Sequence, residues 1–137
     1  MARAISAAGI VLFLALTTWG ITPASAVVTS NTLAAYCSPS GDVCFRAVVK
    51  NGTVRLGITT AARYFARYTL CVRPPGVGAV ARIRCGSFPI FRGSKVWYGS
   101  VRLLPTFPGG QPGAYRVTWK LDGVPLGPTL QFRLPLG

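Results

Sequence analysis

The stretch Gly113–Leu134 begins with a regular alternation of side chains over residues 114–121. One face of an extended strand there is wholly apolar: Tyr115, Val117, Trp119, Leu121. A period of two is typical of a half-buried strand, and the following Asp122-Gly123 supplies the positive φ angles of a two-residue turn. This turn pairs Leu121 with Val124 and Trp119 with Leu126, and the same face then continues through Leu130, Phe132 and Leu134. The pattern predicts a β-hairpin.

A second hairpin is predicted over Val43–Thr60. Asn51-Gly52 is a strong signal for a tight turn, because both residues tolerate positive φ. With this turn, three apolar pairs fall on one face: Val49 with Val54, Ala47 with Leu56, and Phe45 with Ile58. Turn and alternation therefore predict the same register.

Further strand patterns cover four stretches separated by Pro- and Gly-rich turns: Val27–Ala35, Tyr64–Val72, Ala81–Ile90 and Lys95–Leu104. About seven short antiparallel strands with turn signals between them predict an all-β, immunoglobulin-like sandwich. Pro125 and Pro128 cannot donate to a strand ladder, so we expect the last strand at a sheet edge.

The four cysteines, Cys37, Cys44, Cys71 and Cys85, are even in number and predict disulfides in an exported chain. Three connectivities exist, and we favour Cys37–Cys44 with Cys71–Cys85, because each pair brackets a turn-like segment. The second pair conflicts with the alternation, which places Cys71 on a polar face and Cys85 on an apolar face. A bulge near the turn, or a disulfide crossing a loop, would remove the conflict, and the sequence leaves both open.

The first 26 residues have the features of a signal peptide. Arg3 precedes an apolar run from about Ala7 to Leu16, and Ala24-Ser25-Ala26 offers the small residues that signal peptidase accepts. We therefore expect cleavage after Ala26, a secreted single domain over residues 27–137, and no transmembrane segment in the mature chain. We also expect a monomer.

The chain lacks most residue types that carry catalysis. It has no His and no Glu, and its two carboxylate side chains, Asp42 and Asp122, lie beside glycines in predicted turns. Nucleophilic triads and His-based metal sites therefore lack their components. Paired-carboxylate hydrolysis would need Asp42 and Asp122 to meet across a site, and we favour their interpretation as turn formers. We expect a non-enzymatic protein with no cofactor and no metal.

Positive charge is the main functional signal. The net charge of +13 includes Arg3, so the mature chain carries +12, above the roughly 2–8 of an ordinary small domain. Such a surface attracts polyanions, and wall polymers, acidic polysaccharides, anionic lipid surfaces and nucleic acids are candidates, although no specific nucleic-acid motif is present. The basic residues are densest in one segment, which we take as a candidate anion site: Arg63, Arg67, Arg73, Arg82, Arg84.

Two other functions remain open. The protein could be a structural or protein-interaction domain with incidental charge, since arginine-rich composition also arises in GC-rich genomes, or a secreted cationic effector or inhibitor. Beside Arg63 and Arg67, either Tyr64 or Phe65 must point outward from a strand and could stack on a ligand.

The closing stretch resembles the last hairpin of immunoglobulin-like domains. Tyr115 stands where a tyrosine corner often sits, which implies a hydrogen bond from its hydroxyl to the backbone a few residues upstream. The series Tyr115-Arg-Val117-Thr-Trp119, Asp122-Gly123-Val124, Pro125, Gly127 and Phe132 is also similar to periplasmic copper-resistance C-type domains. Val124 occupies the position of their copper-binding His, so this resemblance implies the fold and no copper.

The export prediction is tested by intact mass. The protein recovered after export from a bacterial host should begin at Val27 and gain the mass of four hydrogen atoms on reduction. A mass that includes Met1 contradicts cleavage, and an unchanged mass on reduction contradicts the disulfides.

Overall fold

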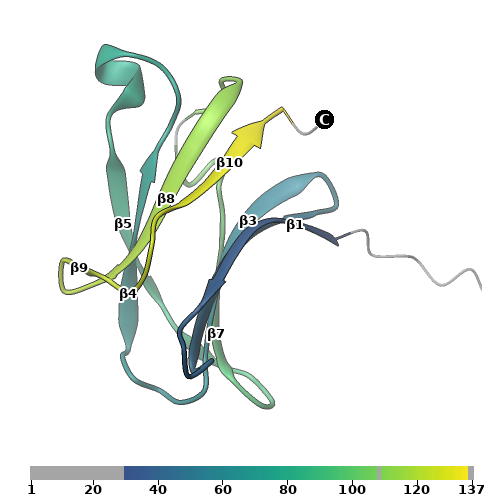
Figure 1. Ribbon diagram of the computed structural model, residues 1–137, viewed down its shortest axis with the longest axis vertical. Helices are drawn as coiled ribbons and strands as arrows, with labels where there is room; N and C mark the ends of the chain where they lie inside the picture. The colour runs from purple at the N-terminus through teal and green to yellow at the C-terminus, as the bar shows by residue number, and fades with distance from the viewer. Residues whose placement is uncertain (1–29, 108, 136–137) are drawn as a thin grey trace, which may run out of the picture.

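The computed structural model describes residues 30–107 and 109–135, which form β-strands with one short helical turn (Figure 1). The strands are β1 (Ser30–Cys37), β2 (Val43–Lys50), β3 (Thr53–Thr60), β4 (Arg67–Arg73), β5 (Arg84–Pro89), β6 (Phe91–Arg92), β7 (Trp97–Arg102), β8 (Gly113–Leu121), β9 (Val124–Pro125) and β10 (Leu130–Leu134). A 3₁₀ turn, η1 (Gly78–Ala81), lies between β4 and β5.

The strands form two antiparallel sheets, in the orders β1-β2-β3-β7-β6 and β10-β8-β4-β5, with β9 paired to β8. The all-β sandwich prediction is confirmed. All expected strands form, although with shifted ends. The two-residue strand β6 was not predicted, whereas β9 is the start of the expected return strand after the Asp122-Gly123 turn.

Both predicted hairpins form with their predicted turns. Asn51 and Gly52 have φ angles of 52° and 74°, and Asp122 and Gly123 have 49° and 79°. The three apolar pairs of β2 and β3 form as predicted. Because each turn is local and each apolar face is unambiguous, the sequence was sufficient here.

The last strand keeps its predicted face but moves along β8. Leu121 pairs with Val124, and the Leu126 amide donates to the Trp119 carbonyl at 2.8 Å. Continuing this register would place Pro128 opposite Val117, but Leu130 takes that place. Since Pro128 has no amide hydrogen to donate, the chain passes it before pairing resumes. The shift is two residues, which preserves the buried face, and β10 lies at a sheet edge as predicted.

Aromatic side chains join the two sheets. Phe45 of β2 stacks on Trp119 of β8 with ring centroids 4.7 Å apart, and both side chains are fully buried. Tyr115 and Phe132 stack at 5.8 Å within the second sheet. Leu56, Leu70 and other inward residues of the predicted alternation fill the space between them.

Both local disulfides form, which confirms the favoured connectivity. Cys71 and Cys85 are direct partners across β4 and β5, so neither a bulge nor a loop crossing resolves the conflict of faces. The alternation of β5 is instead inverted at its start: Arg84 lies opposite the buried Val72, whereas Ile83 is exposed. This is tolerated because Arg84 is at the end of the strand, where its side chain reaches solvent.

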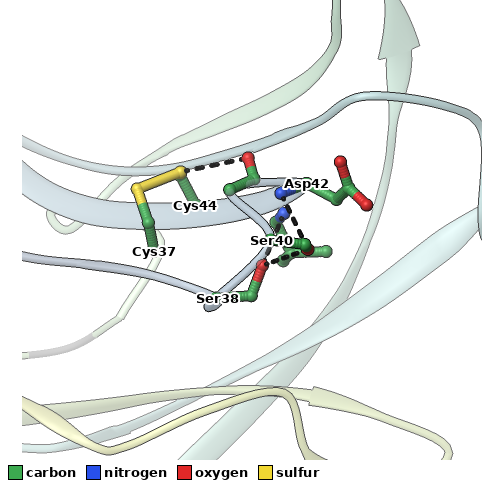
Figure 2. The surroundings of a disulfide bond; sticks show 7 residues. Cys37, Ser38, Ser40, Asp42 and Cys44 are labelled. Carbon is green, nitrogen blue, oxygen red and sulfur yellow. Dashed lines mark hydrogen bonds between the residues drawn. A yellow bond between two sulfur atoms is a disulfide. The ribbon is translucent and has the colours of Figure 1, made fainter.

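The Cys37–Cys44 disulfide closes a tight loop (Figure 2). The Ser38 hydroxyl accepts a hydrogen bond from the Val43 amide at 3.2 Å, and the Ser40 hydroxyl accepts one from the Asp42 amide at 3.3 Å. The carboxylate of Asp42 points away from these hydroxyls. Asp42 is thus a turn residue on the surface.

The predicted signal peptide, residues 1–26, lies outside the described residues. In the part of the chain that is described, no helix is long and apolar enough to cross a membrane. Two disulfides are typical of proteins in an oxidising, extracellular environment.

Close packing between the sheets depends on the glycine at position 99. A Cβ there would lie 2.6 Å from Cε1 of the buried Tyr68. We expect Gly99→Ala to lower the free energy of unfolding by about 1–3 kcal/mol through overpacking. Gly57→Ala on the adjacent strand is the control, because its nearest contact is 3.7 Å, and it should change stability by less than about 1 kcal/mol. Equal effects in denaturant titrations would contradict this packing.

The hydroxyl of Tyr68 is buried and has no hydrogen-bond partner among the described residues. Burial raises its pKa from 10 to about 12. Between these pH values the unfolded chain releases the proton while the folded chain retains it, so stability is complete below pH 10 and falls as pH rises. Tyr68→Phe should leave the free energy of unfolding at pH 7 unchanged or higher. It should also remove about 2–3 kcal/mol of the stability that the wild type loses as pH rises above 10. A marked destabilisation at pH 7 would show that the hydroxyl has a partner.

Candidate anion-binding face

One outer face of the sandwich is rich in positive charge. Residues directly opposite each other in neighbouring strands share a face, so the register of β10-β8-β4-β5 identifies the side chains that point away from the core. Five of these are basic: Arg67, Arg73, Arg116, Lys120, Arg133. We call this surface the β4–β8–β10 face.

Two arginines of this face are direct cross-strand partners. Arg73 of β4 pairs with Arg116 of β8, and both are exposed. Like charges at directly opposite positions are destabilising. The chain has only two carboxylate side chains to offset them, and Asp122 lies in the turn beyond the far end of β8. An external anion between the guanidinium groups would relieve this repulsion.

A groove of about 340 Å³ runs over the same strands. Arg73, Arg116 and Lys120 line it together with polar side chains, the disulfide-bonded Cys71 and the apolar Ile83. The hydroxyls of Thr118 and Thr129 lie 2.7 Å apart in a hydrogen bond. The groove therefore offers three cationic groups and hydroxyl donors, which is the chemistry that binds phosphate or carboxylate.

The structure distributes the five arginines predicted as one site. Arg67 and Arg73 share the β4–β8–β10 face, but they lie at opposite ends of β4, roughly 20 Å apart. Arg67 also donates to Ser87 of β5 through Nε at 3.0 Å and through Nη2 at 2.9 Å. Arg82 lies within the β4–β5 connection, and Arg84 begins β5 opposite Val72.

Arg63 belongs to a different surface. Its guanidinium carbon lies 5.4 Å from the ring centroid of Trp97 of β7, within the range of a cation–π interaction. As expected, one of the two aromatic neighbours is exposed: Tyr64 faces solvent and Phe65 packs against the core.

The opposite outer face is also basic. Its outward cationic residues on β2, β3 and β7 are Arg46, Lys50, Arg55 and Arg102. Arg55 and Arg102 are direct cross-strand partners, and Arg55 Nη1 donates to Ser100 Oγ at 3.4 Å. Three of these residues line a groove of about 700 Å³ with Tyr98. Positive charge thus covers both sheets.

The sequence did not single out Arg116, Lys120 and Arg133 as site residues. The alternation of β8 places Arg116 and Lys120 on the polar side of the strand, which was visible. That this side lies next to Arg73 follows only from the pairing of β4 with β8, whose residues are more than 40 positions apart in the chain.

The tyrosine hydrogen bond that the immunoglobulin-like resemblance implies is present. The Tyr115 hydroxyl donates to the Gln111 carbonyl at 2.9 Å and accepts from the Gly110 amide at 2.9 Å. Val124, at the position of the copper-binding His, is exposed beside the Asp122-Gly123 turn. No protein-family model, curated protein or solved structure matches this chain.

Proposed function

We propose that the protein is a small, secreted, basic and non-enzymatic binding module that contacts an anionic extracellular partner through the β4–β8–β10 face. The signal-like segment over residues 1–26 and the two disulfides support export. The strong excess of basic over acidic residues supports an anionic partner.

The Arg73–Arg116 pair carries this proposal. It combines two guanidinium groups in direct register with an adjoining groove that also contains Lys120. Guanidinium groups bind phosphate and carboxylate through paired hydrogen bonds, and one anion can accept from both arginines. An extended polyanion could follow the face from Arg133 toward Arg67.

Salt dependence and paired substitutions test the proposal, with inorganic polyphosphate as the probe. We expect binding that weakens steeply with salt, because each bound phosphate displaces counterions. Arg73→Gln/Arg116→Gln should reduce the affinity by about tenfold or more. It should also lower the slope of log affinity against log salt concentration by somewhat less than one for each phosphate contact that is lost. Isothermal titration calorimetry across a salt series measures both.

Arg55→Gln/Arg102→Gln is the matched control. It also removes a cross-strand arginine pair and the same net charge, but from the opposite sheet. We expect a much smaller loss of affinity for this variant. Binding by the wild type that persists undiminished at high salt would contradict an electrostatic site.

Basic residues on both outer faces favour a second function, a structural or protein-interaction domain with incidental charge. In that case the two paired variants should behave alike, because affinity would follow net charge and not position. Equal losses in the experiment above would therefore favour this alternative.

A further inference from the structure

The β4–β5 connection carries an unusual concentration of exposed apolar side chains. Val77, Val80 and Ile83 are 87%, 52% and 56% exposed. Single exposed apolar residues are ordinary on protein surfaces, but here three fall within seven positions. We call residues 74–83, which include η1, the β4–β5 tip.

Arginines surround the tip. Arg73 precedes it, Arg82 lies within it, and Arg84 follows it, and all three are exposed. Arg116 adjoins its base, since Arg73, Pro75 and Arg116 line one small hollow. Exposed apolar side chains flanked by cations are complementary to an anionic membrane surface, where an apolar acyl region lies beneath negatively charged headgroups.

The tip is held in a fixed position on the sandwich. The Cys71–Cys85 disulfide joins the strands at its base. Pro74-Pro75 limits the backbone as the chain leaves β4, and Pro75 packs so closely on Gly113 that a Cβ there would lie 2.7 Å away. Figure 1 shows η1 at one end of the molecule, past the ends of β4 and β5.

The two carboxylates lie toward the opposite end of the sandwich. Asp122 follows the end of β8, whereas the tip adjoins its start. Asp42 precedes β2, and its carbonyl accepts from the Ala61 amide after the end of β3. The Gly127 region that follows β9 packs on Tyr36 and Phe45, next to the Cys37–Cys44 loop, so both acidic turns share one end. Among the described residues, the tip end therefore presents positive charge with no acidic side chain nearby.

We propose that the β4–β5 tip docks on a bilayer that contains anionic lipids, with Val77, Val80 and Ile83 entering the interface and the flanking arginines contacting lipid phosphates. This inference rests on the proposed function, because it names the anionic partner as a lipid surface. The exposure of these residues favours this partner over a soluble ligand: Val77 and Val80 are exposed and line neither groove described above, and Ile83 is exposed at the edge of the groove that holds Arg73 and Arg116. The affinity for such a surface is the sum of a contribution from buried apolar area and a contribution from electrostatic attraction to anionic lipids.

Vesicle sedimentation with the disulfide-bonded protein tests this inference. We expect binding to phosphatidylcholine vesicles that contain phosphatidylglycerol and little binding to vesicles of phosphatidylcholine alone. Val77→Ser/Val80→Ser should weaken binding to the anionic vesicles by about tenfold, because interfacial affinity scales with buried apolar area. The effect of this pair on polyphosphate binding should be small.

Val96→Ser/Val124→Ser is the matched control. It makes the same chemical change at two exposed valines away from the tip, Val96 between β6 and β7 and Val124 in β9. We expect nearly unchanged vesicle binding and, for both pairs, unchanged thermal unfolding. Equal losses for the two pairs, or no loss for either, would overturn docking by the tip.

Tryptophan fluorescence is a second measurement, and it reports whether the tip enters the membrane interface. The emission of Val77→Trp should shift to shorter wavelength on anionic vesicles, whereas that of Val124→Trp should not. Binding of polyphosphate without binding of vesicles would overturn the membrane inference and leave the proposed function standing. Binding of neither probe would remove both.

Discussion

The stack of Phe45 on Trp119 is the contact on which the sandwich depends. It joins β2 to β8, each the strand next to the edge of its sheet, with a ring separation of 4.7 Å. Because the two sheets meet through tightly packed aromatic side chains, most of the remaining buried positions are apolar, and they are small where a ring already occupies the space. Gly99 above Tyr68 is one such position.

Burial of one face of each strand has an electrostatic consequence. Polar positions of an alternating strand all point to the outer face, so arginines that alternate with core residues are brought onto the same surface as those of neighbouring strands. With two acidic side chains in the whole chain, these arginines meet each other and not a carboxylate. Arg73–Arg116 and Arg55–Arg102 are the result, one pair on each sheet.

What could be predicted from the sequence follows from the range of the interactions involved. The two hairpins and both disulfides were predictable, because Asn51-Gly52, Asp122-Gly123 and the cysteine spacings are local signals. The register of β10 and the inverted face of β5 were not, because Pro128 and the cross-strand pairing of Cys71 override the local alternation. The arginines near Arg73 were incompletely identified for the same reason, since Arg116 joins them only through sheet pairing.

The inverted face of β5 links the fold to the proposed membrane contact. Direct pairing of Cys71 with Cys85 sets the orientation of the residues just before it, and Ile83 is thereby turned outward on the same side as the cysteines. If the apolar face of β5 pointed to the core, as its sequence alternation predicts, Ile83 would be buried and the exposed apolar area would be smaller. The disulfide therefore keeps an apolar side chain in solvent, at a cost in hydration, beside arginines that also lack counter-charges. A partner that is both anionic and apolar would offset both costs at one contact.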